Sequence, residues 1–211
     1  MKILIINPNS DQQMGKAIQE SAENFVRDRF EVVCENTPGA PAFIETYEDM
    51  SKAATGMINL AKENESKYDA FVIGCHYDPN LDVMKEILKK PVVGIGEASI
   101  KIASMLGHRF SILTTDDHSI PIHEELVRKY NLYEVLASVR APGRETEKCS
   151  EAEKYLIMAR LAIEKDRAEV IVLGCAGLTG LDRRLRQELN VPVLDGVVCA
   201  LFIAAGLAEI G

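Results

Sequence analysis

The sequence predicts an α/β protein of two similar halves, each with a parallel β-sheet covered by helices on both faces. Apolar, β-branched runs alternate with amphipathic stretches along the whole chain, which is typical of buried parallel sheets. Two segments about a hundred residues apart repeat one order of motifs, which indicates an internal duplication. The length of 211 residues is enough for one large domain or two small ones.

The individual elements follow from the spacing of apolar residues. We expect strands where short β-branched runs are bounded by turn residues. These runs are 2–6, 30–34, 70–74, 92–93, 110–113, 135–139, 170–174 and 193–194. We expect helices where apolar residues recur with helical spacing. These stretches lie near 11–26, 49–65, 80–89, 98–106, 118–130, 150–166, 180–189 and 196–208.

The duplicated segments are FVIGCHYDPNLDVMKEILKKPVVGIGEA and VIVLGCAGLTGLDRRLRQELNVPVLDGVV. Each contains a strand, Gly-Cys, a turn, Leu-Asp, an amphipathic helix, Pro-Val and a short strand. This repeat predicts two α/β halves related by a pseudo-twofold axis, with the active site in the cleft between them. The first half would cover 1–96 together with a C-terminal helix at 196–211, and the second half 97–195.

The composition excludes several classes of function. The net charge of −8 argues against binding nucleic acid or an acidic membrane surface, because both need a basic face. No apolar run is long enough to span a membrane, and the start MKILIINPNS lacks the pattern of a secretion signal. We therefore expect a cytoplasmic protein with five reduced cysteines. No CxxC pair or zinc-type Cys/His spacing occurs, so no metal site is expected.

Two Gly-Cys pairs occupy matching places in the repeat, Gly74-Cys75 and Gly174-Cys175. Each follows a predicted strand, and ligands of parallel sheets bind at the carboxyl ends of strands. A pseudo-twofold axis would bring the two thiols face to face. Two bases on opposite faces of one carbon are what a racemase needs, since one thiolate removes a proton and the opposite thiol returns it. The sequence therefore predicts Cys75 and Cys175 as catalytic residues.

The environment of these thiols also leads to an expectation about their pKa. A helix is predicted soon after each of the two cysteines, and its N-terminus should lower the thiol pKa. Cysteine is also a favoured buried residue at strand ends, but that interpretation does not explain two matched positions. The remaining cysteines lack the Gly-Cys context and are expected to be structural: Cys34, Cys149 and Cys199.

Polar residues follow the first predicted strand of each half. Asn7, Asn9 and Ser10 end the first strand, and Thr114 and Thr115 end its counterpart. Asn9 and Ser10 are good helix N-caps, and the threonine pair could cap the helix near residue 119. Since they lie at the same edge as the cysteines, they could equally bind a carbonyl or carboxylate of a substrate. The residues alone leave both interpretations open.

Further residues are expected to shape the cleft. Pro41 belongs to the TPGAP loop, and Ala176 and Gly177 directly follow the second cysteine. Backbone amides at 75–77 and 175–177 are candidates for stabilising an oxyanion. The motif GIGEAS at 94–99 lacks the third glycine of GxGxxG and does not follow the first strand, so a dinucleotide is rejected.

Taken together, the motifs resemble those of hydantoin and allantoin racemases in the aspartate/glutamate racemase superfamily. INPNS alone is a weak match, but with PVxGIGEA and two Gly-Cys motifs the set is specific. The matching blocks span nearly the whole chain: INPNS at 6–10, TPGAP at 37–41, IGCHYDPNLD at 73–82, PVVGIGEA at 91–98, LGHRFSILTT at 106–115, SIPIHEELVRKYNL at 119–132, IVLGCAGLTGL at 171–181 and VPVLDGVV at 191–198.

The resemblance implies a cofactor-independent racemase, an isomerase, that acts on a small molecule such as a 5-substituted hydantoin or a cyclic ureide like allantoin. It implies that Cys75 usually serves the D form and Cys175 the L form, with no metal or pyridoxal phosphate, in a homo-oligomer. One position departs from the family, because relatives commonly carry Phe where this chain has His76. His76 could bond the backbone or form a polar wall of the substrate pocket. This departure puts the substrate in doubt rather than the chemistry.

Two alternatives remain open. An aspartate or glutamate racemase would need several polar anchors for its charged substrate, and the INPNS and Thr-Thr segments supply these only in part. The superfamily also includes a decarboxylase that works with one thiol, whereas this chain has a matched pair. A non-catalytic, two-lobed protein that binds a small molecule would need the cleft but no reactive thiols.

Overall fold

The computed structural model describes residues 1–211, apart from the side chain of residue 145. Its eight strands form two four-stranded sheets in which every neighbouring pair is parallel. The chain divides into two compact units, Met1–Ala98 with Val197–Gly211, and Ser99–Gly196. The predicted α/β class, with one parallel sheet in each of two similar halves, is confirmed.

The first unit has the strand order β2-β1-β3-β4. Its strands are β1 (Lys2–Asn7), β2 (Glu31–Asn36), β3 (Ala70–Ile73) and β4 (Val92–Gly94). The helices connected with them are α1 (Gln12–Val26), α2 (Tyr47–Asn64) and α3 (Leu81–Ile87). Almost all of α8 (Gly196–Ile210) also belongs to this unit.

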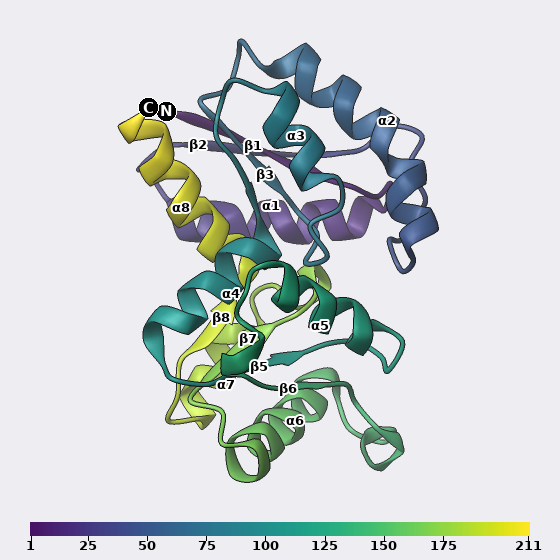
Figure 1. Ribbon diagram of the computed structural model, residues 1–211, viewed down its shortest axis with the longest axis vertical. Coiled ribbons are helices and arrows are strands. Elements are labelled where there is room, and N and C mark those ends of the chain that lie inside the picture. The colour runs from purple at the N-terminus through teal and green to yellow at the C-terminus, as the bar shows by residue number, and fades with distance from the viewer. The chain divides into compact units, whose positions relative to one another are not determined.

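Both faces of the first sheet are covered, which explains why its central strands are apolar throughout. Leu4 and Ile6 of β1 pack against Met57 of α2 and Met84 of α3. Successive side chains of a strand point to opposite faces, so Ile5, which is fully buried, points to the other face. Figure 1 shows α1 on that side of the sheet, opposite α3.

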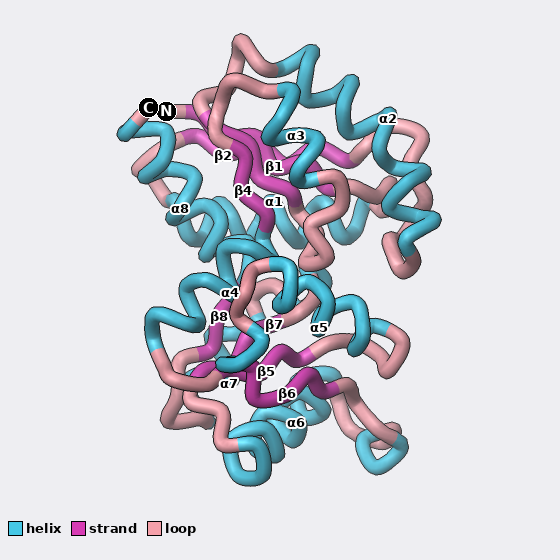
Figure 2. Tube along the Cα trace, viewed as in Figure 1, coloured by secondary structure: helices cyan, strands magenta, loops and turns pink.

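The second unit repeats this arrangement with the order β6-β5-β7-β8. Figure 2 shows its strands in magenta with helices around them. The strands are β5 (Phe110–Leu113), β6 (Leu136–Arg140), β7 (Val170–Leu173) and β8 (Val193–Asp195). The helices are α5 (Ser119–Lys129), α6 (Glu151–Asp166), α7 (Leu181–Glu188) and the part of α4 (Ile95–Leu106) that follows Ala98. Short 3-10 helices lie at Tyr133–Val135, Arg144–Thr146 and Ala176–Leu178.

The second sheet is also buried on both faces. Ile112 packs with Ile100 of α4 and Leu126 of α5 on one face. The next residue, Leu113, packs with Met158 of α6 on the other face. Ile100 follows the end of the first unit in the chain but contributes to this core, so the crossover helix α4 completes the second unit.

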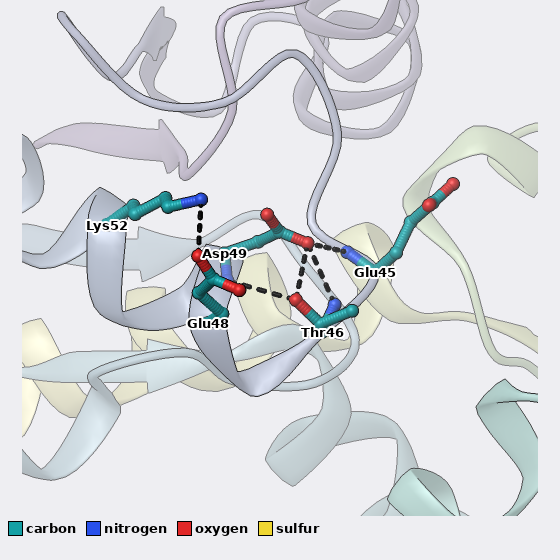
Figure 3. Close-up of polar contacts among 5 residues, drawn as sticks. All are labelled: Glu45, Thr46, Glu48, Asp49 and Lys52. Carbon is teal, nitrogen blue, oxygen red and sulfur yellow. Dashed lines mark hydrogen bonds and ion pairs between the residues drawn. The ribbon is translucent and has the colours of Figure 1, made fainter.

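The long helices α2 and α6 begin with the same device. Figure 3 shows that the Thr46 hydroxyl oxygen accepts the Asp49 N–H at 3.1 Å, while the Asp49 carboxylate accepts the Thr46 N–H at 3.0 Å. Ser150 and Glu153 form the equivalent capping box at α6. Such a box satisfies N–H groups that the first turn leaves without partners. It explains why α2 begins at Tyr47, two residues before the start that apolar spacing predicts.

No helix among the described residues is both long enough and apolar enough to cross a membrane.

Candidate active site

The two Gly-Cys pairs lie at equivalent places in the two sheets. The Gly74 amide donates to the Ile6 carbonyl oxygen at 2.8 Å, and the Gly174 amide donates to the Leu113 carbonyl oxygen at 2.7 Å. Each cysteine is therefore the second residue after the strand that pairs with the first strand of its unit. Both cysteines are half-buried and free of disulfides. The sheet topology thus places each thiol at the carboxyl edge, where ligands of parallel sheets bind.

In the first unit, Asn7 is a fully buried amide at the end of β1. Its Nδ2 donates to Asn9 Oδ1 at 2.8 Å and to Asn36 Oδ1 at 2.9 Å. Its own Oδ1 accepts no hydrogen bond from any described residue of the chain. A buried carbonyl oxygen without a donor costs free energy. Asn7 Oδ1 is therefore a buried acceptor that the described part of the chain leaves unsatisfied.

The rest of the Asn-Pro-Asn-Ser segment is also held in place. Asn9 is buried, and its Oδ1 accepts the Asp11 N–H at 3.1 Å. Ser10 is exposed, and its backbone N–H donates to the Pro41 carbonyl oxygen at 3.0 Å. The expectation that Asn9 or Ser10 caps α1 is wrong, because Asp11 occupies the N-cap and accepts the Met14 N–H at 2.6 Å. The hydroxyl of Ser10 is left free of the capping role.

The turn after Cys75 is fixed by a buried carboxylate. The Asp78 N–H donates to the Cys75 carbonyl oxygen at 3.0 Å. The Asp78 carboxylate accepts the Gly96 N–H at 3.0 Å and the Glu97 N–H at 2.6 Å. These bonds stabilise the first turn of α4, so α4 begins at Ile95, earlier than the predicted start near residue 98. His76, which lies within this turn, is 1% exposed and so presents almost no surface to solvent.

In the second unit, the Cys175 thiol has a pKa raised above its ordinary value. Burial is the main cause, the negative charge of Asp116 adds to it, and a hydrogen bond from the Gly177 N–H opposes it. That N–H lies 3.3 Å from Cys175 Sγ. The expectation of a lowered pKa is therefore wrong for Cys175. The field of a helix end falls off within about one turn, and α7 begins only at Leu181.

The predicted threonine pair divides into two different environments. Thr114 is buried, and its Oγ1 lies 3.0 Å from Nε2 of His123. Thr115 is exposed, and its hydroxyl donates to the Asp116 carboxylate at 2.9 Å. The expectation that the threonines cap α5 is wrong, because the Asp116 carboxylate accepts the Ser119 N–H at 3.0 Å. Thr114 is thus the counterpart of Asn7. Asn7 directly follows Ile6, which accepts the Gly74 N–H, and Thr114 directly follows Leu113, which accepts the Gly174 N–H.

A second carboxylate, Asp195, holds the turn after Cys175. It lies at the end of β8 and accepts hydrogen bonds from the Thr179 hydroxyl and from the Gly180 N–H, the latter at 3.0 Å. Ala176 in this turn is buried, whereas Gly177 is exposed. Asp195 and Asp78 therefore both accept backbone N–H groups with a buried carboxylate. Asp195 lies at the end of a strand, whereas Asp78 lies in the turn itself.

The structure places some of the predicted site residues in contact with one another and shows further residues that support them. Asn7 contacts Asn9, Ser10 contacts Pro41, and Cys175 contacts Gly177. Four polar residues that support these groups were not predicted: Asn36, Asp78, His123 and Asp195. Sequence spacing gives little sign of them, because each is distant in the chain from its partner. Among the described side chains, no group of three or more His, Cys, Asp or Glu could hold a metal ion.

The α/β fold with two parallel sheets matches that of solved racemases, and comparisons of the sequence agree. The chain is 37% identical over 217 residues to a hydantoin racemase of Pseudomonas sp. strain NS671, covering 100% of this chain and 87% of the relative. A model of the family described as Asp/Glu/Hydantoin racemase matches residues 3–204. The chain belongs to this family and is a racemase, which is an isomerase.

Solved structures support the same assignment. An allantoin racemase from Klebsiella pneumoniae superposes with a TM-score of 0.93 at 30% identity, covering 100% of this chain and 89% of that chain. An allantoin racemase from Pseudomonas fluorescens gives a TM-score of 0.92 at 33% identity, with 100% and 92% covered. The resemblance inferred from the sequence motifs is confirmed.

Proposed function

We propose that the protein racemises a 5-substituted hydantoin or a similar cyclic ureide such as allantoin, with Cys75 and Cys175 as the two bases. Similarity over the full chain to hydantoin and allantoin racemases supports this substrate class. The observation that carries the mechanism is that the two thiols occupy the same position in two equivalent parallel sheets. No other pair of cysteines in the chain shares a Gly-Cys context.

The reaction begins at the ring carbon that bears the substituent. A thiolate takes the proton of this carbon, and the bonding electrons move toward the adjacent carbonyl oxygen to form an enolate. The thiol on the opposite face then gives its proton to the same carbon, so the configuration inverts and the enolate reverts to the carbonyl. The first cysteine now holds a proton and the second is a thiolate. The reverse reaction uses the same groups with their roles exchanged.

The raised pKa of Cys175 assigns it a starting role. A thiol whose pKa lies above its ordinary value is protonated at neutral pH. In this proposal Cys175 starts as the proton donor, and the Gly177 N–H, which lies 3.3 Å from its Sγ, stabilises the thiolate when the proton has left. The complementary base is Cys75, which in this scheme removes the proton of the D form.

Two polar side chains are suited to hold the ring. A ring N–H of a hydantoin or ureide would bond Asn7 Oδ1, the buried acceptor that no described residue satisfies. The hydroxyl of Thr114 at the end of β5 is a donor for a ring carbonyl. This pairing favours a cyclic ureide over aspartate or glutamate, whose charged ammonium and carboxylate groups would need ionic partners.

Proton NMR in D2O tests this proposal directly. We expect solvent deuterium at the stereogenic carbon of hydantoins or allantoin, together with a loss of optical activity. Exchange with aspartate or glutamate alone would favour the amino-acid racemase. Binding of a ureide without any exchange would favour the two-lobed binding protein. The Cys75→Ser and Cys175→Ser variants are the controls, and both should lose racemisation.

We further propose that the enzyme works in the cytoplasm as a homo-oligomer without metal or organic cofactor, and that it binds neither nucleic acid nor membrane. Activity that survives dialysis against EDTA would support the absence of a metal. Light scattering after size exclusion tests the oligomer, and a single-chain mass would contradict it.

A further inference from the structure

His123 is a buried histidine that the two-thiol reaction does not use. It lies on α5, and its exposed fraction is 0%. Its Nε2 is 3.0 Å from Thr114 Oγ1 at the end of β5. The same nitrogen also lies close to Gly174, which directly precedes Cys175, because a β-carbon built on Gly174 would be 3.1 Å from it. One side chain therefore joins the ends of the two central strands at the edge that carries the Cys175 thiol.

We propose that His123 is a positioning residue, which orients the Thr114 hydroxyl toward the substrate and holds the Gly174 peptide so that the Cys175 thiol is aimed correctly. This inference rests on the proposed function of Cys175. Neither His123 nor Gly174 touches the reacting atoms in this scheme. Both act through the residues that do.

The charge state of His123 fits this task. Burial lowers the pKa of His123 to about 3, while the nearby Gly174 backbone acts in the opposite direction. The imidazole is therefore neutral throughout the physiological range and offers one N–H donor and one acceptor nitrogen. Nε2 can therefore either donate to Thr114 Oγ1 or accept from it, and in both cases the contact fixes where the hydroxyl lies.

The space around Gly174 shows how closely it is held. A β-carbon at this position would lie 2.6 Å from Ile112 Cγ2 and 3.1 Å from His123 Nε2. The Gly174 amide donates to the Leu113 carbonyl at 2.7 Å. The peptide that leads into Cys175 is thus fixed by the neighbouring strand on one side and by the imidazole on the other. If the imidazole is lost, the turn that brings the Gly177 N–H to the thiol loses one of its supports.

In the first unit, the corresponding strand end is held by asparagine side chains. Asn7, the counterpart of Thr114, is held by Asn9 and Asn36 from the loop and the next strand. At Gly15 the helix α1 leaves room for Asn36, because a β-carbon there would lie 2.2 Å from Asn36 Oδ1. The two strand ends therefore have different supports, and the helix-borne imidazole belongs to the Cys175 side alone.

The decisive test compares His123→Leu and His123→Gln with Thr114→Val and with the double variant His123→Leu/Thr114→Val. We expect His123→Leu to lower kcat by about 10- to 100-fold with little change in KM, because small misplacement of a reacting group has effects of this size. Gln can place an amide N–H near Nε2, so His123→Gln should recover part of the loss. The double variant should be no slower than the slower single variant, because both changes remove one interaction.

A second readout does not depend on the substrate. Alkylation of Cys175 by iodoacetamide at pH 8, followed by peptide mass spectrometry, should be slower in His123→Leu and His123→Gln than in the wild type. The control is His118→Leu at the N-cap position of α5, where the side chain is exposed and makes no capping hydrogen bond. Wild-type kcat and alkylation in folded His123 variants would overturn the inference. If the wild type fails to racemise hydantoins but alkylation still depends on His123, only the proposed function is overturned.

Discussion

The carboxylate of Asp78 accepts the backbone N–H of Glu97 at 2.6 Å and so ties the turn after Cys75 to the first turn of α4. In the second unit the Asp195 carboxylate accepts the Gly180 N–H at 3.0 Å and so connects the end of β8 to the turn after Cys175. Each sheet therefore holds its Gly-Cys turn with one buried carboxylate. The carboxylate extends from the turn in the first unit and from the strand end in the second.

Removing the Asp78 carboxylate should destabilise the protein. Asp78→Ala leaves the buried N–H groups of Gly96 and Glu97 without this acceptor, and we expect the free energy of unfolding to fall by about 2–4 kcal/mol. Asp78→Asn retains one acceptor oxygen and should cost less. Urea unfolding measures both. The control is Asp28→Ala, at an exposed position, which should change stability by less than about 0.5 kcal/mol. Equal losses in all three variants would contradict this account.

The two glycines before the cysteines should tolerate a methyl group differently. A β-carbon on Gly174 would lie 2.6 Å from Ile112 Cγ2 and 2.9 Å from the Leu113 carbonyl oxygen, whereas on Gly74 the nearest atom, Ile5 Cγ2, is 3.1 Å away. Overpacking of this kind costs about 1–3 kcal/mol. We expect Gly174→Ala to lower the urea midpoint more than Gly74→Ala. A larger loss in Gly74→Ala would be inconsistent with the packing described.

The titration of Cys175 should be shifted to high pH. Burial raises its pKa and the charge of Asp116 adds to the rise, so the thiolate fraction, and with it the alkylation rate, should still increase above about pH 8.5, the ordinary thiol value. Asp116→Asn should move the midpoint back toward that value. Cys34, whose pKa burial raises to about 12, should react more slowly still. A Cys175 midpoint below that of a free thiol would argue against these environments.

His123 should make the folded protein sensitive to acid. Its pKa is about 3 when folded and near 6.5 when unfolded, so between these values the unfolded chain binds a proton that the folded chain does not. The free energy of unfolding therefore rises with pH; this contribution is complete above about pH 6.5 and is lost as the pH falls toward 3. From pH 7 to pH 5 the loss from this group is about 2 kcal/mol.

Urea unfolding at these two pH values checks the prediction. In His123→Gln the free energy of unfolding should fall by about 2 kcal/mol less between pH 7 and pH 5 than in the wild type. His118→Gln, at an exposed position, should keep the wild-type pH dependence. If His123→Gln keeps the full wild-type dependence, other groups cause the acid sensitivity.

Much of the fold could be predicted from the sequence because its signals are local. Apolar runs such as Val170–Leu173 mark buried strands, and the repeated Gly-Cys motif predicts that Cys75 and Cys175 occupy equivalent places. The family resemblance rests on blocks of this kind. Local signals were enough for the class, the sheets and the candidate bases.

The supporting contacts could not be predicted, because they join residues that are far apart in the chain. His123 and Gly174 are neighbours only after α5 packs on the sheet, and no spacing in the sequence connects them. The raised pKa of Cys175 is likewise a consequence of burial, which outweighs the helix end that the sequence suggested. The first N–H groups of α1 and α5 are likewise bonded by residues that the spacing does not indicate, since Asp11 is the N-cap of α1 and the Asp116 carboxylate accepts the Ser119 N–H at α5.

The measurement that tests the central claim most directly follows both enantiomers of a hydantoin in D2O with the wild type, Cys75→Ser and Cys175→Ser. Wild-type enzyme should interconvert the enantiomers and introduce solvent deuterium at the stereogenic carbon. Each serine variant should lose racemisation by about a thousandfold or more, because a hydroxyl is a far weaker acid and base than a thiol at neutral pH. Full interconversion of both enantiomers by either single variant would contradict the assignment of Cys75 and Cys175 as the two bases.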